Sequence, residues 1–292
     1  MVRKAVLPVA GLGTRFLPVT KSVAKEMLPV VDKPAIQYLI EECARSGLDD
    51  VLLVTATGKV AMEDHFDRRL DLEAALADKG KDDELALVKG LAQLAKIHSV
   101  RQPEPLGLGH AINMASGHVN RDESFAAMLG DDLLHPSSDF LERMIEAHER
   151  TGRPVIALSE VPRDQVHMYG VADVEPTDRD GEFTVRRMVE KPPTDEAPSN
   201  LILVGRYVLP GTIFDVLENT PPGRGGEIQL TDALQTMASD EPIVGLKLDV
   251  PRYDTGDKLG YLKANVEFAA EREDLGEDLL AWLAGFLAER GK

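Results

Sequence analysis

The chain has 292 residues, of which 43% are hydrophobic and 28% charged, and its formal net charge is −17. This balance is ordinary for a globular protein, and the length allows one large or two small domains. The negative charge argues against nucleic acid and anionic membranes as partners.

A single cysteine, Cys43, excludes an intrachain disulfide, so a reducing, cytoplasmic location is the simplest expectation. Residues 1–4 lead directly into a short apolar run, and we therefore expect no signal peptide. Cys43 falls on the apolar face of a predicted helix, which indicates a small core residue rather than a reactive thiol.

The first half of the chain alternates apolar strands with helical segments. Strands are expected at Ala5–Val9, Val51–Thr55, Ile97–Arg101, Phe125–Leu129 and Val155–Leu158. A helix is expected to start at Asp32-Lys33-Pro34, with the proline in its first turn and Gly47 as its C-terminal cap. Further helices are expected within Val60–Ile97, interrupted near Gly80, and at His110–His118 and Phe140–Arg150. This order predicts a parallel sheet with right-handed crossovers.

The pattern changes after about residue 165. Gly170–Val174 and Phe183–Val189, joined through Asp178-Arg179-Asp180-Gly181, predict a β-hairpin. The remaining elements are strands at Leu201–Leu209 and Ile243–Val250, a turn at Tyr253–Gly256, and helices at Ile213–Leu217, Ile228–Met237, Leu259–Glu271 and Asp278–Glu289. We therefore predict an α/β fold with a mixed, mostly parallel, doubly wound sheet and an added antiparallel portion.

A glycine-rich turn follows the first predicted strand. Gly11 and Gly13 can bring bare backbone N–H groups against an anion, and Arg15, Lys21 and Lys25 follow within one short segment. Such a cluster suits a polyphosphate. The turn has neither the Gly-Lys-Ser/Thr of a Walker loop nor a third glycine for a dinucleotide fingerprint. The alternative is a turn with solvated basic residues.

Gln102 and Asp131 follow other predicted strands, at the edge where open α/β sheets bind ligands. Gln102 offers an amide that can pair with a pyrimidine edge, and Gly107 would allow a base or ribose to approach closely. Asp131 is the best candidate for a Mg²⁺ ligand. The alternatives are a surface-loop glutamine and a turn aspartate. The seven histidines show no spaced ligand set, since His110 and His118 lie eight residues apart on one predicted helix.

The segments Ala10–Pro18 (AGLGTRFLP) and Lys25–Pro29 (KEMLP) resemble the signature of sugar-1-phosphate nucleotidyltransferases, most of all the bacterial UTP–glucose-1-phosphate uridylyltransferases. Later segments agree: Gly107–Ala111 (GLGHA), Gly130–Asp132 (GDD), Val189–Pro192 (VEKP) and Gly225–Asp232 (GGEIQLTD). The resemblance extends from about Lys4 to Asn265. Ala24 departs from it, because the family usually has a proline there that rigidifies the loop.

The resemblance implies a single domain with a Rossmann-like nucleotidyltransferase fold over residues 1–292. Its nucleotide-binding half would be 1–165, its sugar-phosphate-binding half 166–270, and its C-terminal helix 271–292. The implied reaction is Mg²⁺-dependent transfer of uridylyl from UTP to α-D-glucose 1-phosphate, giving UDP-glucose and pyrophosphate. A thymidylyltransferase using dTTP and a non-catalytic UDP-glucose-binding relative are the alternatives. A homo-oligomer, dimer or tetramer, is also implied.

The family pattern assigns roles to individual residues. Arg15, Lys25 and Lys191 would be catalytic, with the first two neutralising pyrophosphate and the third holding the sugar phosphate. The expected nucleotide-binding residues are Ala10, Gly11, Gly13, Gln102 and Gly107. Gly170, Glu190 and Lys191 would bind the sugar phosphate, and Asp131 and Asp254 the metal. Both lysines are expected in loops, where replacement costs little stability.

Overall fold

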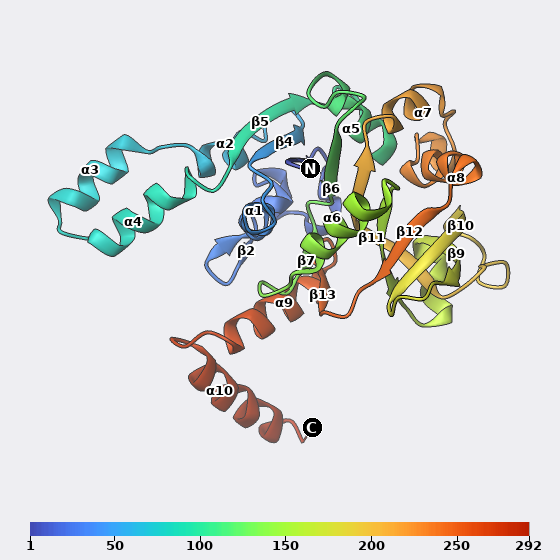
Figure 1. Cartoon of the computed structure of the whole chain (residues 1–292). Helices are drawn as coiled ribbons and strands as arrows, with labels where there is room; N and C mark the ends of the chain where they lie inside the picture. The colour runs from blue at the N-terminus through green and yellow to red at the C-terminus, as the bar shows by residue number, and fades with distance from the viewer. Residues whose placement is uncertain (292) are drawn as a thin grey trace.

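The computed structural model describes residues 1–291 and confirms the α/β fold (Figure 1). Within this range, a nine-stranded sheet runs in the order β5-β4-β1-β6-β11-β8-β12-β10-β9. Its strands are β1 (Lys4–Pro8), β4 (Asp50–Thr55), β5 (Lys96–Arg101), β6 (Ser124–Met128), β8 (Val155–Glu160), β9 (Gly170–Pro176), β10 (Glu182–Glu190), β11 (Leu201–Pro210) and β12 (Ile243–Lys247).

The sheet is mixed, as predicted. Strands β5, β4, β1 and β6 run parallel, and β12 runs parallel to β8. β11 inserts antiparallel between β6 and β8, and the predicted hairpin forms from β9 and β10. β12 pairs antiparallel with β10 and so joins the hairpin to the rest of the sheet.

Hydrophobic cores cover both faces of the sheet, which makes it doubly wound. Because side chains alternate along a strand, Ala5 and Leu7 face one core while Val6 faces the other. The first core receives α1 (Ala35–Arg45), α6 (Phe140–Thr151) and α9 (Lys258–Ala270). The second receives α5 (Leu108–Asn113), α7 (Ile213–Asn219) and α8 (Leu230–Asp240). Cys43 is fully buried in the first core, as its helical position predicted.

Two predicted boundaries are wrong for the same reason. A short pair of strands forms where the sequence predicted the first turn of a helix in one case and a turn in the other. β2 (Pro29–Val30) pairs with β3 (Lys33–Pro34), so Pro34 is the N-cap of α1 rather than a residue of its first turn. β13 (Arg252–Asp254) pairs with β7 (Asp132–Leu134), so Tyr253 and Asp254 lie in a strand. Two-residue and three-residue strands carry too little periodicity to be recognised in a sequence.

Two helical segments project from the body of the molecule (Figure 1). After α2 (Ala61–Phe66), the helices α3 (Leu70–Asp78) and α4 (Asp82–Leu91) form an arm, and they are separated by Gly80 as predicted. The last helix, α10 (Gly276–Glu289), extends beyond α9. In residues 1–291 no helix is long and apolar enough to cross a bilayer.

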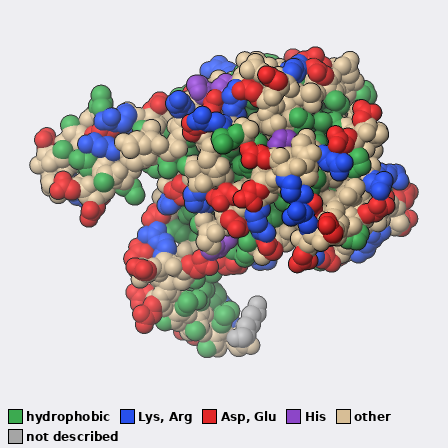
Figure 2. Space-filling view, viewed as in Figure 1, with side chains coloured by type: hydrophobic (Ala, Val, Ile, Leu, Met, Phe, Trp, Pro, Cys, Tyr) green, Lys and Arg blue, Asp and Glu red, His purple; other side chains and the backbone are tan. Residues whose placement is uncertain are grey.

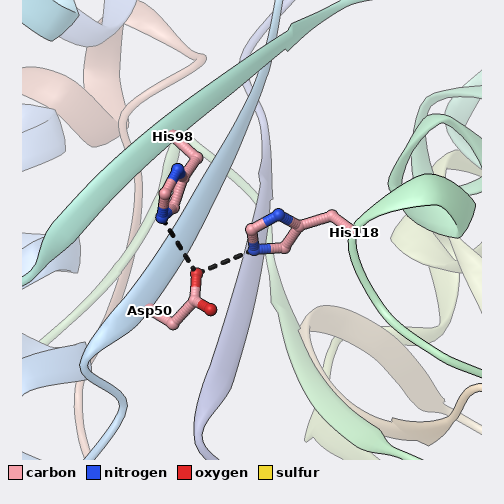
Figure 3. A group of neighbouring side chains, drawn as sticks. All are labelled: Asp50, His98 and His118. Atoms are coloured by element: carbon pink, nitrogen blue, oxygen red, sulfur yellow. Dashed lines mark hydrogen bonds and ion pairs between the residues drawn. The ribbon is translucent and has the colours of Figure 1, made fainter.

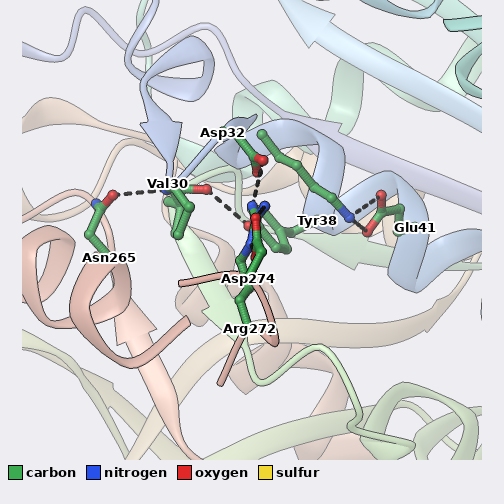
Figure 4. A network of polar contacts seen from close by, with 9 residues as sticks. Val30, Asp32, Tyr38, Glu41, Asn265, Arg272 and Asp274 are labelled. Carbon is green, nitrogen blue, oxygen red and sulfur yellow. Dashed lines mark hydrogen bonds and ion pairs between the residues drawn. The ribbon is translucent and has the colours of Figure 1, made fainter. Parts of the chain in front are cut away.

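Polar contacts attach the C-terminal segment to the turn between β2 and β3 (Figure 4). The Val31 amide, at a positive φ of 60°, donates to Asn265 Oδ1 at 2.9 Å. Arg272 bridges Asp32 and Asp274, and Tyr38 donates to the Val30 carbonyl at 2.9 Å. Helix α9 is thereby fixed beside β13, whose last residue is a candidate metal ligand.

Candidate active site

The glycine-rich segment folds back on itself, so that its cations meet its glycines. β1 ends at Pro8, and three short 3₁₀ turns follow: η1 (Thr14–Phe16), η2 (Val19–Lys21) and η3 (Lys25–Met27). Gly13 has φ 65°, and a Cβ there would lie 3.1 Å from Lys25 Cβ. The tight approach therefore requires glycine both for its conformation and for its size. Ala24 has φ −60°, which a proline would also adopt.

Lys25, Asp131 and Asp254 come together, although they lie far apart in the sequence. Lys25 Nζ forms an ion pair with Asp131 Oδ2. A Cβ built on Gly256 would lie 2.5 Å from Asp131 Oδ2 and 3.0 Å from Asp254 Oδ1, so both carboxylates face the same small volume. Arg15 Nη1 donates to the Gly256 carbonyl at 3.4 Å and places a second cation at this point.

The short strand pair brings Asp254 to this position. The pairing of β13 with β7 sets Asp254 opposite Asp132, next to Asp131. The Thr255 amide and hydroxyl both donate to the Asp131 carbonyl, at 2.7 and 2.9 Å. Asp132 itself is buried and accepts from the Gly205 amide and from Arg252, so it fixes the backbone that presents Asp131.

The electrostatics of the cluster favour a cation. Burial alone would raise the pKa of Asp131, but the Lys25 ammonium and its hydrogen bond hold that pKa below its usual range. Burial and the nearby Asp131 carboxylate raise the pKa of Asp254. Two hard carboxylate donors beside each other and open to phosphate oxygens suit Mg²⁺, which prefers few protein carboxylates. The residues present therefore fit the implied ion.

Four of the five candidate nucleotide-binding residues line one pocket of about 220 Å³, and Gly13 is not among the residues of its wall. Ala10, Gly11, Gln102 and Gly107 all contribute to its wall. Gln102 Nε2 donates to the Gly107 carbonyl at 3.2 Å and lies 3.0 Å from His110 Nδ1. The Gln102 side chain therefore bridges the two ends of the loop 102–107 and lines the pocket directly after β5. Gly107 has φ 106°, and a Cβ there would lie 2.7 Å from the Ile228 carbonyl oxygen, so it lets the loop pack against the later segment.

The register of the β9–β10 hairpin brings the candidate sugar-phosphate residues together. β9 and β10 pair so that Gly170 lies opposite Glu190. Lys191 follows at a positive φ of 47°, and its Nζ lies 3.3 Å from Glu190 Oε1. Burial and the carboxylates of Glu190 and Asp132 raise the pKa of the buried Tyr207 phenol.

Sequence reasoning missed three residues. Lys59 Nζ pairs at 2.9 Å with Glu26, which is almost fully buried beside Lys25. Thr231 Oγ1 donates to Glu190 Oε2 at 2.6 Å. His110 contacts Gln102. Lys59 follows the carboxyl end of a predicted strand, and Thr231 and His110 lie within the motifs quoted above. Their positions in the sequence could therefore have indicated a place in the site.

Comparisons with known proteins agree with this arrangement. The nucleotidyl transferase family matches residues 4–271 of the chain. A UTP–glucose-1-phosphate uridylyltransferase from Staphylococcus haemolyticus is 45% identical over 283 residues, 97% of each chain. The structure of a UTP-bound UGPase from Acinetobacter baumannii is 42% identical with a TM-score of 0.90, covering 97% of this chain and 99% of its own.

A UDP-glucose pyrophosphorylase in complex with UDP-glucose is 38% identical with a TM-score of 0.83, covering 93% of this chain and all of its own. The resemblance inferred from the sequence motifs is confirmed by relatives that match over nearly their full length. The chain belongs to the nucleotidyl transferase family.

Proposed function

We propose that this chain transfers uridylyl from UTP to α-D-glucose 1-phosphate and releases pyrophosphate. Support comes from full-length relatives named for this reaction and from related structures with UTP and UDP-glucose bound. The observation that carries the proposal is the convergence of Lys25, Asp131 and Asp254 beside the glycine-rich loop. A polyphosphate with a divalent cation is the ligand that such a cluster best accommodates.

The chemistry is an in-line substitution. An oxygen of the sugar-1-phosphate dianion attacks the α-phosphorus of UTP, one new P–O bond forms, and the bond to the β-phosphate breaks to release pyrophosphate. The nucleophile is already ionised near neutral pH, so no strong general base is required. The catalytic task is to hold two anions together and to stabilise the charge of the leaving group.

Each cation has a separate part in this proposal. Lys25 and Arg15 would neutralise the departing pyrophosphate, and Lys191 would hold the attacking phosphate. Asp131 and Asp254 would bind Mg²⁺, which when bound supplies positive charge to the phosphate oxygens. Lys25 would then exchange its Asp131 partner for a phosphate oxygen. Glu190 and the Gly170 backbone would bind sugar hydroxyls, and Gln102 the uracil edge.

Pyrophosphate release tests the reaction. We expect release from UTP that requires both glucose 1-phosphate and Mg²⁺. A UDP-glucose-binding protein without catalysis would bind UDP-glucose and release no pyrophosphate, and that result would overturn the proposal. The thymidylyltransferase alternative is separated by initial rates with UTP and dTTP. The two bases differ by one methyl group, and we expect UTP to be used at least about tenfold more efficiently.

We also propose a homo-oligomer in the cytoplasm. The location rests on the single free, buried cysteine. Apolar side chains gather on α10 (Figure 2), where Leu280, Trp282 and Leu287 are exposed and available for subunit contact. These three side chains are therefore not part of the core of one chain. Light scattering should give a mass above the 31.9 kDa of one chain; a monomer at micromolar concentration would contradict the proposal.

A further inference from the structure

Two histidines and an aspartate meet at the N-terminal edge of the parallel strands β4 and β5 (Figure 3). Asp50 Oδ1 lies 2.7 Å from His118 Nε2 and 3.7 Å from His98 Nε2. One ligand atom from each residue falls within 4.8 Å of the others. Ligand atoms on a tetrahedral Zn²⁺ with bonds of about 2.0–2.1 Å are themselves ~3.3 Å apart. Small side-chain adjustments would therefore bring all three onto one ion.

The sheet register explains why these residues meet. Asp50 begins β4 opposite Lys96 of β5, and His98 lies two residues further along β5, on the same face. His118 follows the 3₁₀ turn η4 (Met114–Gly117) at the end of α5. Lys4 Nζ donates to the His118 carbonyl at 2.8 Å and holds this turn against the sheet. This placement brings together two histidines that sequence reasoning treated as unrelated.

The nearby cations Lys4 and Arg3 pair with other carboxylates, so the Asp50 carboxylate is contacted by the two imidazoles. Lys4 pairs with Glu123 at 2.7 Å, and Arg3 pairs with Asp49 at 2.6 Å. Across residues 1–291 the basic side chains that lie at ion-pair distance from the Asp50 carboxylate are His98 and His118. The His98 side chain is half exposed, and a hollow of about 790 Å³ lined by Lys4, Asp50 and Glu123 opens at this edge. A hydrated cation can therefore reach the cluster.

We propose that Asp50, His98 and His118 form a site for a borderline-soft divalent cation of the Zn²⁺ type. Two imidazole nitrogens and one carboxylate oxygen are the donors that such ions prefer, with a fourth position left for water. Mg²⁺ instead prefers oxygen donors, so the site is chemically distinct from the Asp131 and Asp254 cluster. The proposal does not depend on the proposed reaction.

The cation would have a structural effect on the nucleotide pocket. His98 precedes and His118 follows the segment that contains Gln102 and Gly107. An ion held by both histidines would close this segment into a loop anchored on β4. Closing a loop removes conformational freedom, so the bound ion should order the pocket wall.

The test uses untagged full-length protein stripped with a chelator and titrated with Co²⁺ in excess Mg²⁺. We expect d–d absorption that saturates at one Co²⁺ per chain and is displaced by Zn²⁺. His98→Ala and His118→Ala should each weaken binding by about tenfold or more. His135→Ala is the matched control. His135 contacts Glu271 without a second histidine beside it, so its replacement should leave Co²⁺ binding unchanged.

His98→Ala is the decisive variant, since its half-exposed side chain can be removed with little effect on folding. Absence of Co²⁺ binding by the wild type, or equal binding by His98→Ala, would overturn the site. Zn²⁺ should also slow amide hydrogen exchange in residues 102–107 of the wild type and leave that exchange unchanged in His98→Ala. Unchanged exchange in the wild type would overturn the effect on the pocket.

Discussion

Lys25 and Lys191 are the two candidate catalytic lysines, and the structure builds them in opposite ways. Lys25 has a side chain only 18% exposed and is bound to an aspartate 106 residues away. Lys191 is 43% exposed and lies against its own neighbour in the chain, Glu190. The first lysine is part of the polar core that joins distant segments, whereas the second is added at the end of a strand. The sequence predicts both lysines in loops, but we expect only Lys191 to be replaceable without a loss of stability.

Replacing Lys25 should have the largest effect, because it damages both stability and function. In Lys25→Ala the Asp131 carboxylate loses its ion-pair partner in a partly buried site, and the Asp254 carboxylate loses a nearby positive charge. We expect a loss of about 2 kcal/mol in the free energy of unfolding, between the values typical of exposed and fully buried pairs. We also expect a loss of roughly 30-fold in kcat/KM. Urea unfolding and initial rates measure the two effects.

Arg15→Ala provides the matched control within the same loop, because Arg15 is exposed and contacts a backbone carbonyl. It should lower activity and leave the free energy of unfolding unchanged within about 0.5 kcal/mol. Adding Asp131→Asn to Lys25→Ala should recover part of the lost stability, since it removes the unpaired charge. A Lys25→Ala protein as stable as the wild type would show that Lys25 contributes nothing to folding and would contradict its contrast with Lys191.

Lys191→Ala should affect function alone. Its charge would meet only glucose 1-phosphate in the forward direction, so KM for that substrate should rise and kcat should fall. If the lysine contributes about 2 kcal/mol, kcat/KM falls roughly 30-fold while the melting temperature is unchanged. Arg186→Ala, which removes an exposed cation paired with Glu175 on the same hairpin, should leave the kinetics unchanged. An equal loss in that variant would show that the effect is not specific.

Ala24→Pro should stabilise the protein by about 0.5–1 kcal/mol. Ala24 already has φ −60°, and within the described chain its amide donates no backbone hydrogen bond. Proline there would reduce the freedom of the unfolded loop and not strain the folded one. A rise in melting temperature with unchanged rates is expected. A fall would show that the loop before Lys25 has a conformation that proline cannot adopt.

The smallest expected effect is that of pH on the Lys25–Asp131 pair. Burial acts against the charge on Lys25, but Asp131 and Glu26 raise its pKa above 10.5, so its contribution persists below pH 10.5 and is lost only above its raised pKa. The lowered pKa of Asp131 makes its contribution persist above pH 3.8 and disappear only below that lowered pKa. The double-mutant coupling energy from urea unfolding should therefore be the same at pH 6 and pH 9. Loss of coupling between these values would contradict the assignment of charges.

The central fold could be predicted from the sequence because its signals are local. Short apolar runs predicted the parallel strands, and a turn motif predicted the hairpin that aligns Gly170 with Glu190. The fixed geometry of parallel sheets then placed Gly11, Gln102 and Asp131 at one edge. Pairings between very short strands could not be predicted, since β7 and β13 have too few residues for a periodic pattern.

The same limit applied to the sites. Asp254 was named through resemblance, but its position depends on the β7–β13 pair that the sequence did not reveal. The Glu26–Lys59 pair and the cluster of Asp50, His98 and His118 each combine residues from separate elements. Such contacts depend on the register between strands and on helix docking, which spacing along one segment does not determine.

The separation of the two lysines is tested most directly by titrating UTP into Lys25→Ala and Lys191→Ala by calorimetry, in one Mg²⁺ buffer and after circular dichroism shows that both are folded. We expect Lys191→Ala to bind UTP as the wild type does and Lys25→Ala to bind it roughly 30-fold more weakly. Weakened UTP binding by Lys191→Ala together with wild-type binding by Lys25→Ala would contradict the assigned roles.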